Sequence, residues 1–288
     1  AKKIDQKTNI EQLFGVAISA TLSTNYKKKG SHRFHIAVQT RDFSQSISCI
    51  LNKGQRTREE EEELVTEFVI ALISHCCGFE FKYPKIKEDV EHIQIPAQKG
   101  WADLMSEKIK FVTSSNQQPK LIFPGAFNPM HDGHIAMSEL ANKELSEEVF
   151  FEICIQNVDK PPLSYYQIKK TIDQFTDSKN WVLTKAGKFS DKAKLFPNST
   201  FIIGADTLVR IFDEKFYASR REMMEEFEIF NTNNNNFLVF GREYKNKFIE
   251  LNDIQLPDSI KSRFRGFGEN IFRKDVSSST IRAQNSEE

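Results

Sequence analysis

Ten consecutive residues combine a tight turn with two imidazoles and follow directly on an apolar run. Residues 125–134 read Gly-Ala-Phe-Asn-Pro-Met-His-Asp-Gly-His and come after Leu121-Ile122-Phe123. This order predicts a strand, a turn and a helix start, where unpaired N–H groups and the positive dipole end favour an anion. Gly125 can adopt backbone angles denied to other residues, and His131 and His134 lie three residues apart on one helical face. We therefore expect both imidazoles to reach one phosphate chain.

This segment resembles the G-x-F-x-P-x-H-x-G-H signature of the nucleotidyltransferase superfamily that includes nicotinamide mononucleotide adenylyltransferases and cytidylyltransferases. The resemblance implies catalytic roles for His131 and His134. It also implies nucleotide contacts from the three residues that open the motif, Gly125, Ala126 and Phe127.

A second signature of that superfamily, roughly I-S-S-T-x-I-R, is similar to residues 276–282, which read Val-Ser-Ser-Ser-Thr-Ile-Arg. Hydroxyls that begin a helix can cap its free N–H groups and can also bond phosphate oxygens. An arginine one turn on presents a fixed, charged fork. The resemblance implies a catalytic charge on Arg282 and nucleotide binding by the serines, Ser277, Ser278 and Ser279.

Another strand end carries a glycine and an aspartate. The apolar residues 201–203 are followed by Gly204, Ala205 and Asp206. Glycine admits a ligand close to the backbone, and an aspartate can accept hydrogen bonds from ribose hydroxyls, although it can also serve as an N-cap. A similar G-x-D segment holds the ATP side in adenylyltransferases for nicotinamide mononucleotide or its acid form, which implies that role for Gly204 and Asp206.

Two further residues are candidates for the site. Lys160 lies in residues 157–164, where Pro161 and Pro162 favour an extended loop, and it can neutralise phosphate. The resemblance includes the family's lysine-containing segment here, but the arginine expected further on is absent. Tyr217 stands where the family often has a tryptophan that stacks on the nicotinamide ring. Base stacking and core packing both remain open for Tyr217.

These residues together imply nucleotidyl transfer without a covalent intermediate. The acceptor's phosphate would attack the α-phosphorus of a nucleoside triphosphate, and the charge would be shared by His131, His134, Lys160 and Arg282. Mg²⁺ would arrive with the triphosphate, so we expect no dedicated metal cage in the protein.

The favoured reaction is adenylyl transfer from ATP to nicotinamide or nicotinate mononucleotide, a step of NAD biosynthesis. One alternative is another NTP or another phosphorylated small-molecule acceptor, as in a cytidylyltransferase or a pantetheine-phosphate adenylyltransferase. The other is a nucleotide-binding regulatory module that is catalytically silent.

The composition is that of a globular protein without a global electrostatic preference. The 288 residues are 39% hydrophobic and 28% charged, which suggests one large or two ordinary domains. Because 40 basic and 40 acidic residues balance, we expect neither nucleic acid nor a membrane as partner.

The cysteines lack metal-ligand spacing, and no signal peptide or bilayer-spanning run is evident, so we expect a cytoplasmic protein. A homo-oligomer remains open, as does a processed chain or a piece of a longer protein, because the sequence begins with Ala1.

Residues 119–288 alternate apolar strands with helical segments. This pattern predicts an α/β fold, a Rossmann-like, doubly wound parallel sheet of the HxGH nucleotidyltransferase type, with ligands beyond the carboxyl strand ends. The expected strands are 121–123, 149–155, 181–184, 201–203 and 237–240, and the expected helices are 132–145, 163–176 and 206–218. The asparagine run at 231–236 is expected to be a loop insert.

Residues 1–80 predict a smaller α/β domain, and residues 81–118 are expected to be a linker. The first region has strands at 14–18, 32–40 and 46–51, then a helix whose acidic start, Glu59 to Glu63, we expect to be solvated.

The N-terminal region also resembles a second family. Residues 10–78 resemble part of the competence-damage-inducible protein C-terminal domain, the family of nicotinamide-nucleotide amidases. The resemblance lies in residues 15–20, 36–40 and 53–59. The family's glycine-rich stretch is replaced by 21–30, and its catalytic serine and lysine segment has no counterpart. We therefore expect this region to be incomplete and non-catalytic.

Overall fold

The computed structural model describes residues 13–26, 28–156, 161–175 and 179–284. The chain divides into two compact units. The N-terminal unit is Ala1–Ser106 with Ser164–Lys169, and the C-terminal unit is Glu107–Leu163 with Lys170–Glu288. Within the described residues, no helix combines the length and the apolar character that crossing a lipid bilayer requires.

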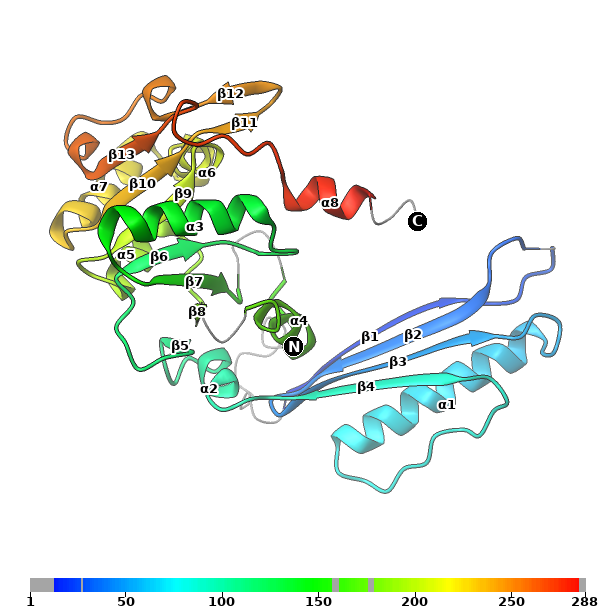
Figure 1. Ribbon diagram of the computed structural model, residues 1–288. Helices are drawn as coiled ribbons and strands as arrows, with labels where there is room; N and C mark the ends of the chain where they lie inside the picture. The colour runs from blue at the N-terminus through cyan, green and yellow to red at the C-terminus, as the bar shows by residue number, and fades with distance from the viewer. Residues whose placement is uncertain (1–12, 27, 157–160, 176–178, 285–288) are drawn as a thin grey trace. The chain divides into compact units, whose positions relative to one another are not determined.

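The N-terminal unit is an antiparallel sheet with one long helix on it. Its strands, as far as the chain is described, follow the order β1-β2-β3-β4, with β1 Gly15–Thr21, β2 His32–Gln39, β3 Phe43–Leu51 and β4 Val90–Pro96. The helix α1 (Arg58–Cys76) lies along one face of the sheet (Figure 1). Alternate residues of β2 are buried beneath it, because side chains of a strand point to opposite faces in turn. The predicted strands and helix of this region are confirmed.

Two expectations about the N-terminal unit need correction. The predicted linker 81–118 instead supplies β4 to this sheet and, beyond the short helix α2 (Trp101–Met105), β5 (Phe111–Thr113) to the sheet of the C-terminal unit. In β4, Ile93 and Ile95 alternate with exposed polar residues, a half-buried strand pattern within a polar stretch. Within the acidic helix start, Glu61 is fully buried, where it accepts a hydrogen bond from the Ser23 N–H and contacts His32 Nδ1 at 2.8 Å.

The C-terminal unit is a doubly wound sheet of parallel strands with an antiparallel edge. Among the described residues the strand order is β13-β10-β9-β6-β7-β8-β5. All neighbours are parallel except β5 and β8. The strands beyond β5 are β6 Leu121–Pro124, β7 Val149–Cys154, β8 Asn180–Thr184, β9 Thr200–Gly204, β10 Asn236–Phe240 and β13 Phe264–Phe267. The predicted fold class is confirmed.

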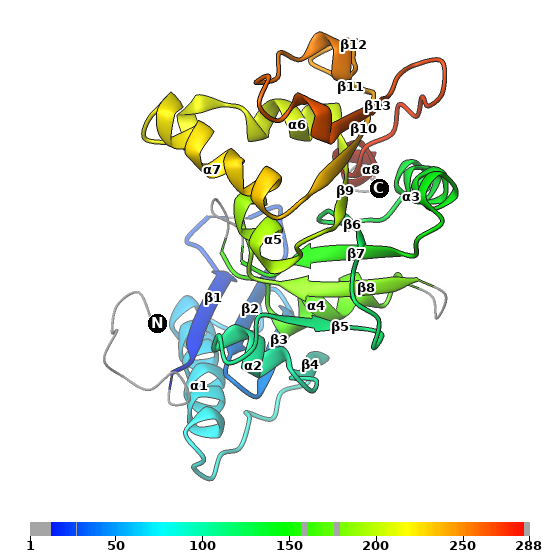
Figure 2. The same ribbon diagram turned by 90° about the vertical axis from the view of Figure 1, so that its left-hand side faces the viewer.

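Helices cover both faces of this sheet. Figure 2 shows α3 on one face, with α5 and α7 on the other. The helices of this unit are α3 Asp132–Leu145, α5 Phe189–Leu195, α6 Ala205–Ile211, α7 Arg220–Thr232 and α8 Ser278–Gln284, while α4 Tyr165–Ile172 contains residues of both units. Short 3₁₀ turns are η2 Glu214–Phe216, η3 Leu251–Asp253 and η4 Lys261–Arg263, and a small hairpin joins β11 Arg242–Tyr244 to β12 Lys247–Ile249.

The asparagine run is not a loop insert. Residues 231 and 232 complete α7, and Asn236 begins β10. Asn235 is fully buried, and its Nδ2 donates to Phe196 O at 2.8 Å and contacts Ser199 Oγ at 3.0 Å. The run therefore joins α7 to the core strand β10, which its low-complexity sequence does not predict.

A buried ion pair joins α5 to β7, the strand next to β6. Lys192 and Glu152 have side chains that are 5% and 1% exposed, and Lys192 Nζ lies 2.7 Å from Glu152 Oε2. Glu152 also accepts from the Thr184 hydroxyl, and its backbone carbonyl accepts from the Gly125 N–H at 3.0 Å. Because each charge is desolvated, each depends on the other for its stability.

We expect Lys192→Met to lower the free energy of unfolding by about 3–5 kcal/mol, since it leaves the Glu152 carboxylate buried without its cation. Lys194→Met is the matched control on the same helix, because the Lys194 side chain is 63% exposed, and it should stay within about 0.5 kcal/mol of wild type. Urea unfolding measures both. Equal values for the two variants would show that the buried pair contributes nothing.

Candidate active site

Two neighbouring parallel strands deliver the main candidate residues to one place. From β6 the chain proceeds outward through β7 and β8, then returns to β9 on the other side of β6. The strand order therefore reverses between β6 and β9, and a crevice forms beyond the carboxyl ends at such a point. The histidine loop, residues 125–134, follows β6, and residues 204–206 follow β9. The structure brings the two segments together.

The two histidines stack at the start of α3. His131 is the N-cap residue, and its ring centroid lies 3.7 Å from that of His134, with the planes 23° apart. His134 Nδ1 accepts from the His131 N–H at 3.3 Å, so a neutral His134 carries its proton on Nε2. His131 is 8% exposed, and neither of its ring nitrogens has a hydrogen-bond partner among the described residues.

The environment keeps both imidazoles neutral. Burial lowers the pKa of His134 to about 3, with smaller contributions from His131 and Arg242. Burial also lowers the pKa of His131, and Arg242 lowers it further, while Asp132 opposes the change. An anionic ligand would reverse these effects, because an opposite charge favours protonation.

The beginning of the histidine loop is closely packed. A Cβ on Gly125 would lie 2.5 Å from Phe127 Cζ, so glycine is required by the packing of this ring and not by its own backbone angles. Phe127 is 1% exposed, and its ring packs edge-on against His134 with centroids 5.1 Å apart. Its side chain therefore supports His134. Ala126 is exposed.

Gly204 and Asp206 stand at the end of β9. Gly204 is the N-cap residue of α6, and a Cβ there would collide with Asp206 Oδ1. This carboxylate oxygen is buried, and no hydrogen-bond partner for it exists among the described residues. Its nearest cation is Arg242, with Nε at 3.9 Å. Asp206 therefore has an acceptor available for a ligand hydroxyl.

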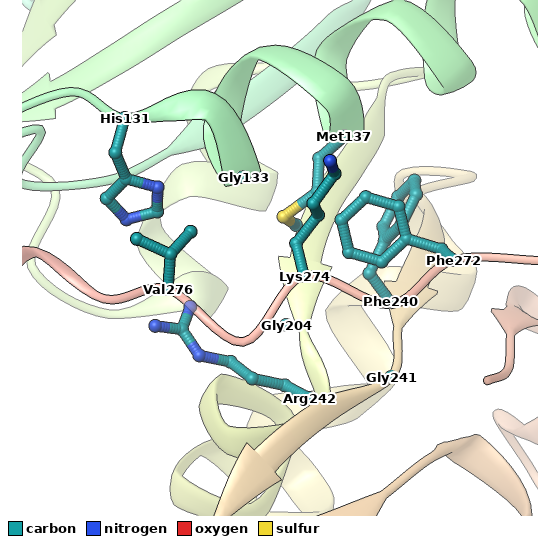
Figure 3. Close-up of a pocket in the computed structure, with 10 residues that line it drawn as sticks. All are labelled: His131, Gly133, Met137, Gly204, Phe240, Gly241, Arg242, Phe272, Lys274 and Val276. Atoms are coloured by element: carbon teal, nitrogen blue, oxygen red, sulfur yellow. The ribbon is translucent and has the colours of Figure 1, made fainter.

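Sequence reasoning missed two cations of the site. Arg242 follows β10, the strand beside β9, and Lys274 comes from the C-terminal segment; both line the cavity that contains His131 and Gly204. In Figure 3 the Arg242 side chain extends toward His131 and Val276. For Arg242, the available signal was a charged residue soon after the apolar strand β10, which ends at the same edge of the sheet. The cavity encloses about 10 Å³, roughly the room for one water molecule.

The C-terminal signature, residues 276–282, holds the histidine loop in place. Ser278 Oγ donates to Pro129 O at 2.8 Å, and the Arg282 guanidinium donates to Asn128 O. Ser277 Oγ caps α8 by accepting from the Thr280 N–H at 3.1 Å, and it contacts Ser279 Oγ at 2.8 Å. These groups bond protein partners in the structure, so they support the loop as well as being candidates for phosphate.

Tyr217 is not among the residues that line the cavity. Tyr217 packs edge-on against Phe227, with centroids 5.7 Å apart, and its hydroxyl donates to Ile211 O at 2.9 Å. Burial raises the pKa of Tyr217 to about 12. The sequence left base stacking and core packing open for Tyr217, and the structure favours core packing. Lys160 lies outside the described residues.

This arrangement can bind a phosphate chain and one sugar. Neutral imidazoles and a helix N-terminus donate hydrogen bonds, Arg242 and Lys274 supply positive charge, and Asp206 accepts. No side chain here is placed as an activated nucleophile, and a reaction governed by position and charge does not need one.

Comparisons with known proteins identify the family of the chain. Among solved structures, nicotinic acid mononucleotide adenylyltransferase of Plasmodium falciparum complexed with NaAD is 16% identical, with 58% of this chain and 83% of that chain covered and a TM-score of 0.33. The same enzyme complexed with APC is 16% identical over the same shares, with a TM-score of 0.32. Among curated proteins, none matches the sequence. The family model described as cytidylyltransferase-like matches residues 122–284, more than half of the chain. The protein therefore belongs to the cytidylyltransferase-like family of nucleotidyltransferases.

Proposed function

We propose that the protein transfers the adenylyl group of ATP to nicotinamide or nicotinate mononucleotide and releases pyrophosphate. The observation that carries this proposal is the stacked pair of His131 and His134 at the start of α3, where the two buried ring nitrogens of His131 have no hydrogen-bond partner among the described residues. Buried polar atoms without partners are rare because they cost free energy. A phosphate chain bound at this point supplies the missing acceptors.

Each residue has one role in this proposal. The ring N–H groups of His131 and His134 donate to the triphosphate, and Arg242 and Lys274 offset its charge. Asp206 Oδ1, which is buried without a hydrogen-bond partner among the described residues, accepts from a ribose hydroxyl. Lys160, Arg282 and the serines of the C-terminal signature remain candidates for the phosphates.

The reaction needs little proton chemistry. A phosphate oxygen of the acceptor forms a bond to the α-phosphorus of the triphosphate, and the bond from that phosphorus to the bridging β-phosphate oxygen breaks. Pyrophosphate leaves with the electron pair. A phosphate monoester is largely ionised at neutral pH, so positioning and charge stabilisation are sufficient. Mg²⁺ enters as part of the triphosphate substrate.

The choice of ATP and a pyridine mononucleotide rests on the Gly204-Ala205-Asp206 segment and on the amidase-like resemblance of residues 10–78. The family match, to a cytidylyltransferase-like model, favours CTP with a phosphorylated alcohol as the second candidate reaction. Both reactions would use the same site. The narrow cavity requires the segment around Val276 to move outward when a triphosphate binds.

The direct test is pyrophosphate release from the purified full chain with Mg²⁺ and each substrate pair. The pairs are ATP with nicotinamide or nicotinate mononucleotide, ATP with phosphopantetheine, and CTP with a phosphorylated alcohol. We expect the first pair to react fastest. Release only with another pair would replace the substrate assignment, and tight ATP binding without release from any pair would identify a regulatory module.

His134→Ala should lower kcat by about 10²–10³-fold, the usual effect of losing one donor to a transition-state oxygen. His35→Ala is the matched control, since His35 is exposed on β2, and it should keep wild-type activity. Thermal melting confirms that both variants fold. A His134→Ala enzyme as active as the control contradicts the role assigned to this imidazole.

Because His134 is buried and neutral, the free energy of unfolding should decrease as the pH is lowered. The pKa of His134 is lowered from 6.5 to about 3, so between these values the unfolded chain binds a proton that the folded chain does not. His134 should therefore contribute a loss of up to about 1.4 kcal/mol per unit as pH falls through this window. Urea unfolding should show a flatter pH dependence for His134→Asn. Identical slopes would mean that His134 is protonated in the folded protein.

A further inference from the structure

One residue outside both signatures spans the histidine loop with two hydrogen bonds. Gln174 follows α4, and its side chain is half-buried. Gln174 Oε1 accepts from the Met130 N–H at 2.8 Å, and Nε2 donates to Phe127 O at 2.8 Å. The partners fix the orientation of the amide, because only its oxygen accepts and only its nitrogen donates. Gln174 therefore closes the loop over residues 127–130.

The backbone held by Gln174 includes a residue in an unfavourable conformation. Phe127 has a φ of 43°, in the left-handed region that residues other than glycine rarely adopt. The next two carbonyls, of Asn128 and Pro129, accept from Arg282 and Ser278. Three consecutive carbonyls of the loop are thus each held by a side chain from a distant part of the chain.

The neighbouring residue fixes the ring beneath the histidines. Phe175 packs edge-on against Phe127 with centroids 5.8 Å apart, and it also packs on Phe151 at 5.1 Å. The Phe127 ring in turn supports His134. Since His131 directly follows Met130, a shift of the Met130 backbone would move the start of α3 and both imidazoles with it.

We propose that Gln174 is a positioning residue for nucleotidyl transfer. It holds residues 127–130 in the conformation that presents His131 and His134 to the phosphate chain. Gln174 is not among the residues that line the cavity, so it acts through the loop and not on the substrate. The kinetic consequence rests on the function proposed above, whereas the structural consequence does not.

The kinetic test compares Gln174→Ala, Gln174→Glu and the control Gln117→Ala in the full chain, with the substrate pair that releases pyrophosphate. Gln117 is an exposed glutamine of the same unit. Gln174→Ala should lower kcat per folded molecule by about 10- to 100-fold, with a smaller change in KM, because a small misplacement costs this much. Gln174→Glu keeps the acceptor for Met130 and should lie between Gln174→Ala and wild type. A loss of activity that only matches the unfolded fraction would overturn the proposal.

A second measurement does not depend on turnover. The imidazole ¹H–¹⁵N resonances of His131 and His134 report their positions in the protein without nucleotide. Gln174→Ala should shift or broaden both sets of signals, and Gln117→Ala should leave them unchanged. If no substrate pair reacts with the wild type, the proposed function fails, yet these signals still decide the positioning role. Unchanged histidine signals in a folded Gln174→Ala protein would overturn it.

Discussion

The reversal of strand order between β6 and β9 is the constraint on which the rest of the site depends. The two strands are parallel neighbours, but the chain continues from them toward opposite edges of the sheet. A crevice is expected beyond the carboxyl ends of two strands arranged in this way. The histidine loop enters it from β6 and Asp206 from β9. The buried pair of Lys192 and Glu152 stabilises the strand next to β6, whose carbonyl anchors Gly125.

Within this crevice the protein keeps polar atoms buried and unsatisfied. His131 and Asp206 have ring and carboxylate atoms without hydrogen-bond partners among the described residues, and burial lowers the pKa of both histidines. Such an arrangement costs free energy in the unliganded protein. A ligand with phosphate oxygens and ribose hydroxyls recovers that free energy on binding. In the proposed function, the same feature that weakens the fold locally provides affinity for a nucleotide.

The sequence predicts the features that are local and misses those that depend on distant partners. Apolar runs followed by glycine located β6 and β9, and histidine spacing located the helix start, because strand and helix patterns lie within a few residues. Arg242 lines the cavity because β10 lies beside β9. Gln174 contacts the histidine loop from the segment that follows α4, which is distant in sequence. Packing supplied what the sequence left open, since Phe127 fills the space beside Gly125 and Tyr217 packs in the core. The strand β4 was not predicted because it lies in a polar stretch, and its alternating burial arises from its pairing with β3.

The central claim is that the phosphate chain of a nucleotide binds against the stacked histidines at the β6–β9 crevice. A crystal structure of the full chain with Mg²⁺ and a non-hydrolysable ATP analogue tests this most directly. The account predicts phosphate oxygens within hydrogen-bonding distance of the His131 and His134 ring nitrogens, with the ribose at Asp206 and the segment around Val276 displaced. A nucleotide bound elsewhere, with the His131 imidazole still buried and without a hydrogen-bond partner, would contradict it.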